Sequence, residues 1–421
     1  MTQSFEIPID KRRNVLDPVP ELREISARTP LFRPPGGMPH WIVTDRELVR
    51  QILADDERFS SMPPPEQDGR KPDPHPGSLL QTDGAVHARL RRLVAPMFTV
   101  RQMKTLEPMM VRIVAERLDV LERAGQPADL MRHFARPVSG LILAEILGLP
   151  RDDLSELSRL GDHRASGHSP RRHSATSEYV GHFRKLVAAE RRNPGEGLAG
   201  ALIREHGDAV SDEEIAGICE SIANGSIENT AETIALGTLA LLCHPEQMTL
   251  LRERPELMDR AVEELLRYVS VVAAVSPRTA LVDVAIGGEV IKAGEVVSCS
   301  VFAANRCPYG DGHGHGNGDG HGDGHGNGDG NGDGDSGSGG DGSADGSAGG
   351  LDIAREPANH LALGYGVHFC LGAALARLQM RVAFTGLLER FPNLRLGAGV
   401  EELRFRVLAP QFGVETLPVL W

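Results

Sequence analysis

The chain has 421 residues, of which 40% are hydrophobic and 24% are charged, so it is long enough to bury a sizeable core. Its formal net charge is −13, but eight aspartates and no Lys, Arg or Glu lie in residues 310–350, and the rest of the chain carries only −5. This balance argues against a nucleic-acid surface, and no uncharged run reaches the roughly 18 residues that a membrane span needs. Because the first thirty residues lack an apolar signal core, we expect a cytoplasmic protein with no membrane or nucleic-acid partner.

Apolar residues at the helical spacing of i, i+3 and i+4 dominate the chain. They predict helices over residues 111–125, 140–149, 178–192, 212–244, 256–269 and 370–391. Strand-like runs are fewer and shorter, at residues 39–45, 281–301 and 412–421. The pattern indicates a fold that is mainly α with small accessory β-sheets, and we expect a single domain over residues 1–421.

Residues 309–350 form a Gly/Asp/His-rich segment of low complexity within that domain. About half of residues 310–350 are glycine and none of them has a large apolar side chain, so this stretch cannot bury enough surface to offset the entropy of ordering. We expect a flexible insertion without a site. Weak binding of a transition metal remains an alternative, through His313, His315, His321 and His325.

One cysteine lies in a distinctive setting, in the sequence LGYGVHFCLGAALARLQM of residues 363–380. The five cysteines are scattered without a CxxC pair, which argues against a disulfide framework or a zinc site. Glycines at 364, 366 and 372 allow left-handed turns and a close approach to a flat partner. A helix predicted from about Leu371 directs the positive end of its dipole at Cys370 and favours its thiolate, which suits a metal ligand. The alternative is a buried cysteine at a helix start.

The segment resembles the haem-binding signature of the cytochrome P450 family, Phe-Gly-x-Gly-x-His-x-Cys-x-Gly. The matching residues are Gly364, Gly366, His368, Cys370 and Gly372, while Leu363 replaces the usual phenylalanine. The resemblance covers nearly the whole chain. It implies the cytochrome P450 fold and a heme b cofactor whose iron has the Cys370 thiolate as axial ligand.

Further motifs are similar to those of the same family. Glu264 and Arg267 are three residues apart on one helical face, and they resemble the family's buried structural ion pair. Cationic residues resemble those that hold the two haem propionates through charge-assisted hydrogen bonds; they are His87, Arg91, Arg278 and His368.

The sequence GSIENT, residues 225–230, aligns with the family's oxygen-activation motif. This alignment makes Glu228, Asn229 and Thr230 the candidate catalytic residues. Asn229 replaces the usual threonine, and an amide can hold a water but does not itself relay a proton. A modified proton relay, chemistry without oxygen insertion, and a neutral exchange compensated by ordered water all remain open.

The resemblance implies a bacterial haem-thiolate monooxygenase of secondary metabolism. It would use O2 and electrons from NAD(P)H, delivered by ferredoxin reductase and ferredoxin, to hydroxylate or epoxidise a small-molecule or carrier-protein-bound substrate. Residues 161–179 are a candidate lid over that substrate, and an acidic ferredoxin would meet Arg89, Arg92, Arg101 and Lys104. One alternative is oxidative coupling of phenols or other aryl groups, and another is a metal-binding or sensing haem protein.

Overall fold

The computed structural model describes residues 7–34, 40–65, 73–165, 172–307, 349–356, 360–407 and 409–421. Helices dominate these ranges, as the sequence predicted. They are α1 (Pro20–Arg28), α2 (Arg46–Ala54), α3 (Gly84–Val94), α4 (Val100–Arg123), α5 (Arg136–Leu147), α6 (Asp153–Ala165), α7 (Arg172–Arg192), α8 (Leu198–His206), α9 (Asp212–Cys243), α10 (Pro245–Glu253), α11 (Met258–Val269), α12 (Val301–Arg306) and α13 (Ala373–Arg390).

The sheets are small, and the expectation of a mainly helical protein with accessory sheets is confirmed. The described strands are β1 (Arg13–Asn14), β2 (Asp17–Pro18), β3 (Leu31–Phe32), β4 (His40–Val43), β5 (Phe59–Ser60), β6 (Ala128–Asp129), β7 (Arg278–Ala280), β8 (Val284–Ile286), β9 (Glu289–Ile291), β10 (Val296–Cys299), β11 (Arg395–Leu396) and β12 (Pro418–Leu420). The largest sheet has the order β3-β4-β10-β7-β5, in which only β10 and β4 are parallel.

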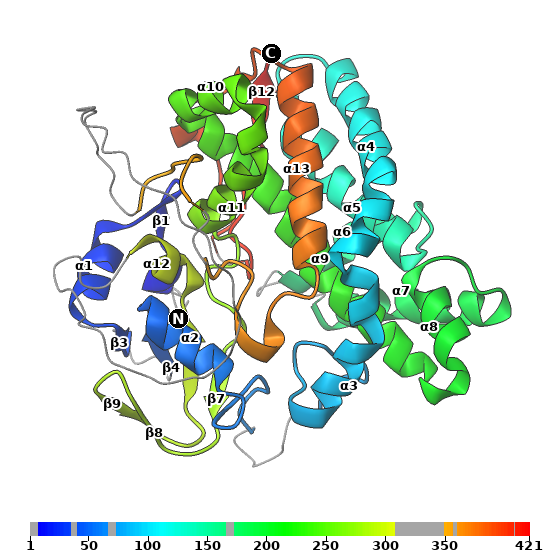
Figure 1. Ribbon diagram of the computed structural model, residues 1–421, viewed down its shortest axis with the longest axis vertical. Coiled ribbons are helices and arrows are strands. Elements are labelled where there is room, and N and C mark those ends of the chain that lie inside the picture. The colour runs from blue at the N-terminus through cyan, green and yellow to red at the C-terminus, as the bar shows by residue number, and fades with distance from the viewer. Residues whose placement is uncertain are drawn as a thin grey trace, which may run out of the picture.

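Helices and sheets occupy different sides of the molecule. The strands β3, β4 and β7 to β9 lie with α1, α2 and α12 on one side, while α4, α5 and α13 lie on the other (Figure 1). Helix α9 contacts α5, α7, α11 and α13, so it runs through the middle of the helical part. This central position explains why α9 is apolar on nearly all faces and buried along most of its 32 residues.

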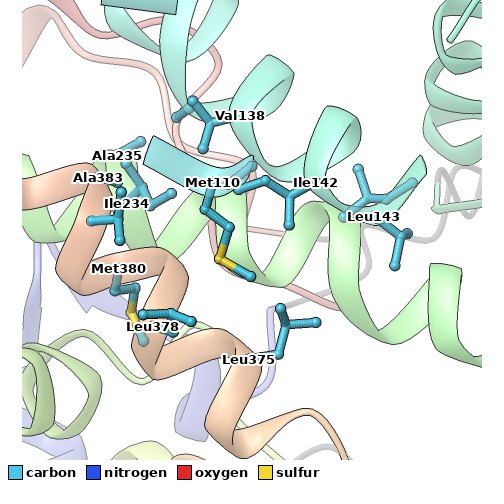
Figure 2. Packing of buried hydrophobic residues seen from close by; sticks show 14 of the residues in the cluster. Met110, Val138, Ile142, Leu143, Ile234, Ala235, Leu375, Leu378, Met380 and Ala383 are labelled. Atoms are coloured by element: carbon cyan, nitrogen blue, oxygen red, sulfur yellow. The ribbon is translucent and has the colours of Figure 1, made fainter. Parts of the chain in front are cut away.

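The main core lies where α4, α5, α9 and α13 meet. Figure 2 shows Met110 of α4 reaching between Ile142 of α5 and Leu375 of α13, with Ile234 of α9 nearby. All four side chains are buried. This packing fixes the position of α9 relative to the amino-terminal end of α13, where Cys370 lies close by in sequence.

The predicted insertion 309–350 lies outside the described residues except for Gly349 and Gly350. The residues that flank it are joined, since Arg306 Nε donates to the Gly349 carbonyl over 2.7 Å. The chain therefore leaves and re-enters the core at adjacent points. Residues 166–171 of the candidate lid also lie outside the described residues.

Among the helices described above, none is by itself long and apolar enough to span a membrane. Helices α9 and α10 reach the length and apolar composition of a membrane span only when they are taken together, and the chain bends by 103° between them.

Candidate active site

A cavity of about 560 Å³ lies between α9, the segment before β7 and the loop that carries Cys370. It brings together residues from three distant parts of the sequence. Its lining includes Asn229, Thr230, Val275, Arg278, Leu363 and Cys370. The candidate cysteine and two of the three candidate catalytic residues therefore share one cavity.

The loop before α13 is closed by its own backbone and packs on α2. The Cys370 N–H donates to the Leu363 carbonyl over 2.9 Å, so these two residues form the base of the loop. Gly364 and Gly366 have φ values of 76° and 71°, which L side chains rarely adopt. A Cβ on Gly366 would also overlap the Leu53 carbonyl oxygen. Gly366 is thus required both by its backbone conformation and by the close approach of α2.

Replacing Gly366 by alanine is expected to destabilise the fold by more than about 2 kcal/mol. A positive φ costs a non-glycine residue about 1–2 kcal/mol, and the overlap with Leu53 adds to this cost. Gly288→Ala is the matched control, because Gly288 has a φ of 82° but nothing lies within 4 Å of its added Cβ. Urea unfolding measures both variants. Equal losses of unfolding free energy would show that the contact with Leu53 is unimportant.

The sulfur of Cys370 is buried, and this burial raises the pKa of its thiol. A hydrogen bond from the Gly372 backbone and the positive charges of Arg91 and Arg377 act in the opposite direction but are weaker. The backbone at the helix start thus acts on the thiol pKa in the expected direction, but in the protein alone burial outweighs it. Helix α13 also begins at Ala373 and not at Leu371. A bound metal ion would supply the positive charge that deprotonates the thiol.

Four cationic or titratable side chains gather beside the loop, at one end of the cavity. The His87 and His368 rings lie 4.0 Å apart between centroids. Burial, followed by the nearby His87 and Arg278, lowers the pKa of His368 to about 4. Arg278 is only 5% exposed, and its one hydrogen bond in the described part of the chain goes to the Ser276 carbonyl. Arg91 donates to the Phe369 carbonyl over 2.5 Å.

Asp83, which directly precedes α3, is a member of this cluster that the sequence analysis missed. Its carboxylate lies 3.3 Å from His368 Nε2 and accepts hydrogen bonds from Ser60 and Ser61. Burial alone would raise the pKa of Asp83, but these hydrogen bonds lower it overall. The carboxylate of Asp83 pairs with His368 and not with either guanidinium group. Arg278 and Arg91 therefore remain without an ion pair among the described residues.

Glu264 and Arg267 form a buried ion pair on α11. Arg267 Nε and Nη2 each donate to a Glu264 oxygen over 2.7 Å, and the two side chains are only 3% and 5% exposed. Arg355 Nε lies 3.4 Å from the same carboxylate, and the Asp352 N–H donates to it over 2.8 Å. Sequence reasoning identified the pair but not Arg355, which lies 91 residues away from Glu264 in the chain.

The three candidate catalytic residues, Glu228, Asn229 and Thr230, lie in two different environments. Asn229 Nδ2 donates to the Gly225 carbonyl over 2.8 Å, while the buried Asn229 Oδ1 has no hydrogen-bond partner among the described residues. Thr230 is buried beside it in the cavity wall. Glu228 is not among the lining residues, and its carboxylate binds Arg136 over 3.3 Å and Arg406 over 3.0 Å. The structure therefore does not bring Glu228 together with Asn229 and Thr230.

The donor set of the cavity fits a haem group. Cys370 offers one thiol sulfur at the wall, and the buried Arg278 and the neighbouring Arg91 offer guanidinium groups without carboxylate partners. Apolar side chains such as Leu363, Leu371 and Val275 form much of the wall between them. A flat apolar ring with an iron at its centre and two carboxylates at its edge would satisfy each of these groups.

Comparison with known proteins identifies relatives over the whole chain. The family described as "Cytochrome P450" matches residues 169–308 and 345–399, on either side of most of the low-complexity segment. Cytochrome P450 165B3 from Amycolatopsis orientalis is 37% identical over 432 residues, which cover 100% of both chains.

Solved structures give the same result for the fold. That of "OxyE (CYP165D3), a Cytochrome P450 Involved in Teicoplanin Biosynthesis" has a TM-score of 0.82 and 41% identity, covering 99% of this chain and 100% of that chain. The structure of OxyC, "a Cytochrome P450 Implicated in an Oxidative C-C Coupling Reaction During Vancomycin Biosynthesis", has a TM-score of 0.81 and 35% identity, covering 98% and 96%.

Proposed function

The chain belongs to the cytochrome P450 family of haem-thiolate monooxygenases, and from this premise we propose that it couples two aromatic rings of a large natural-product substrate by oxidation. Oxidative ring coupling is the alternative to hydroxylation or epoxidation that the sequence left open. Relatives that cover nearly the whole chain support it, because the OxyC structure is described as acting in oxidative C–C coupling. The sensing alternative is set aside because the family is one of enzymes.

The size of the cavity is the structural observation that carries this proposal. The cavity adjoins a second one of about 430 Å³, and the two share the lining residues Leu80, Ser221, Asn224, Ser276 and Pro277. Together they offer about 990 Å³, at the upper end of the roughly 300–1,000 Å³ of pockets for drug-sized ligands, and the haem would take up the part beside Cys370. The second cavity supplies room for an aromatic substrate that extends away from the haem position.

Haem, when bound, supplies the activation of O2. In this proposal Cys370 ligates the iron, while His87, Arg91, Arg278 and His368 hold the carboxylates; Gly364, Gly366 and Gly372 shape the loop. Coupling removes two hydrogens from the substrate, and these reduce O2 to two waters together with two electrons from NAD(P)H and two protons. Oxygen insertion uses the same electrons but places one oxygen atom in the product.

Oxygen insertion is the second candidate, and Thr230 favours it. Its hydroxyl lies in the cavity wall next to Asn229 and could hold a water that donates a proton. The mass of the product separates the two reactions: coupling lowers the substrate mass by two hydrogens, while insertion raises it by one oxygen. Turnover under labelled O2, followed by mass spectrometry, is the decisive test, and a labelled product would contradict the coupling proposal.

Arg278→Gln is expected to weaken haem binding about 10- to 100-fold. A hydrogen bond to a charged group contributes about 1.5–3 kcal/mol, and Arg278 is the most deeply buried guanidinium of the cluster. Arg92→Gln serves as the control, because Arg92 is exposed on the same helix as Arg91. Haem loss to an excess of a haem-accepting protein measures the effect. Equal rates for both variants would remove Arg278 from the haem site.

Asn229→Ala is expected to lower the product formed per NAD(P)H about fivefold, with the excess reducing equivalents appearing as hydrogen peroxide. The free Asn229 Oδ1 can accept a hydrogen bond from water or a substrate hydroxyl, and losing one such bond costs about 1 kcal/mol. Asn229→Thr should leave the product formed per NAD(P)H unchanged, because a hydroxyl also accepts a hydrogen bond. Unchanged peroxide from Asn229→Ala would exclude this residue from the reaction.

Ferredoxin and ferredoxin reductase are the proposed electron donors. Arg92, Arg101 and Lys104 are exposed on α3 and α4, as a docking surface for an acidic protein requires. Arg89 belongs elsewhere, because it forms an ion pair with Glu214 of α9.

A further inference from the structure

The cavity contains one cation that the haem does not explain. Its lining includes no Asp or Glu, and its charged residues are Lys11, Arg91 and Arg278. The two arginines lie with the proposed haem carboxylates. Lys11 comes instead from the 3-10 helix Ile9–Lys11, near the amino terminus. Its ammonium group forms no ion pair or hydrogen bond within the described residues.

The chain on either side of Lys11 is fixed against the cavity wall. Ile9 packs in one cluster with Ala273, next to the lining residues Val272 and Ala274. Arg13 Nη1 and Nη2 donate to the carbonyls of Val269 and Ser270, over 2.5 and 2.7 Å.

A second contact fixes this chain from the opposite side. The Arg13 guanidinium lies 4.1 Å from the centre of the Phe412 ring, and the Phe412 N–H donates to the Val271 carbonyl over 2.9 Å. Phe412 directly follows the lining residue Gln411. The residues on either side of Lys11 are therefore fixed near two wall segments, Val271–Ser276 and Pro410–Gln411, which belong to other parts of the chain than the Cys370 loop.

The neighbouring carboxylate does not neutralise Lys11. Asp10 is only 1% exposed, and within the part of the chain that the structure describes both of its oxygens are buried without a hydrogen-bond partner. Burial raises the pKa of Asp10, although the charge of Lys11 opposes this shift. No ion pair joins the two side chains, so the ammonium group remains available to an anion in the cavity.

We propose that Lys11 binds a carboxylate of the substrate and so selects acidic substrates. The inference rests on the proposed oxidation of a large aromatic substrate in this cavity, and it adds the substrate's charge. Gln411, on the facing wall segment, can donate a second hydrogen bond to the same carboxylate. The haem propionates and the substrate carboxylate would then occupy separate cationic positions.

Calorimetric binding of two matched probes to the haem-loaded enzyme tests the proposal. The probes are N-acetyl-tyrosyl-tyrosine as the free acid and as its carboxy-terminal amide, which share two phenol rings and differ in charge. The wild type should bind the acid about tenfold more tightly, as expected for one charge-assisted hydrogen bond. Lys11→Gln should abolish the preference, and Lys11→Arg should retain it. Lys185→Gln, an exposed lysine on α7, should leave it unchanged.

Salt provides an independent readout on the same samples. The preference for the acid should shrink as ionic strength rises, because ions screen the attraction. A wild type that does not prefer the acid, or a Lys11→Gln variant that still prefers it, would overturn the proposal. Neither result bears on ring coupling, which the mass of the turnover product decides separately.

Discussion

Replacing Cys370 by alanine is expected to abolish both the activity and the thiolate signature in the spectrum of the reduced carbon monoxide complex. Among the described residues that line the cavity, Cys370 is the one cysteine, and its thiol faces the space where the haem fits. Burial raises the pKa of this thiol, and a bound metal ion would favour its thiolate. The loss should be complete, since no other described cysteine can replace the ligand.

Two further variants separate ligand loss from unfolding. Cys370→His supplies another iron ligand, so it should keep haem but lose the thiolate signature. Cys243→Ala is the matched control, because Cys243 is an exposed cysteine at the end of α9, outside the cavity lining. A Cys370→Ala protein that retained the thiolate spectrum would contradict the assignment of the ligand.

Glu264→Ala is expected to lower the free energy of unfolding by about 3–5 kcal/mol and to lose haem as a consequence. Removing one partner leaves the Arg267 charge buried without the Glu264 carboxylate, which is the costly way to break such a pair. Arg267 would keep its hydrogen bonds to the carbonyls of Asn305 and Gly350, over 2.8 and 2.6 Å. Urea unfolding with and without haem measures the loss.

An exposed ion pair on another helix provides the control. Glu24 and Arg28 lie 2.7 Å apart on α1, but their side chains are 60% and 75% exposed. Glu24→Ala should therefore cost less than about 1 kcal/mol. A double replacement of Glu264 and Arg267 by leucine and methionine should cost less than Glu264→Ala, because the buried Arg267 charge is removed together with its partner and the remaining Arg355 is partly exposed. Equal losses for Glu264→Ala and Glu24→Ala would show that the buried pair is not structural.

Local spacing in the sequence determined which side chains share a helical face. His87 and Arg91 are four residues apart on α3, and Glu264 and Arg267 are three apart on α11, so each pair could be predicted without coordinates. The apolar pattern likewise predicted α9 and α13, because a helix repeats every 3.6 residues regardless of its neighbours. The glycines around Cys370 marked its loop in the same way.

Only the tertiary structure decided which distant residues complete these groups. Arg355 and Lys11 are separated by long stretches of chain from the groups that they join, as Asp83 is from His368, and in the sequence each resembles a solvated surface charge. The ion pairs of Glu228 with Arg136 and Arg406 also join segments that lie far apart in the chain.

The pKa of Cys370 shows the physical reason most clearly. The sequence places the sulfur near a helix start, where the dipole lowers a thiol pKa. The fold places Cys370 in a cavity wall that several elements form, and the cost of removing a thiolate from water there exceeds the local effect. Sequence spacing fixes neighbours along one helix, but burial is a property of all the segments that pack around a group, and it exists only once the chain has folded.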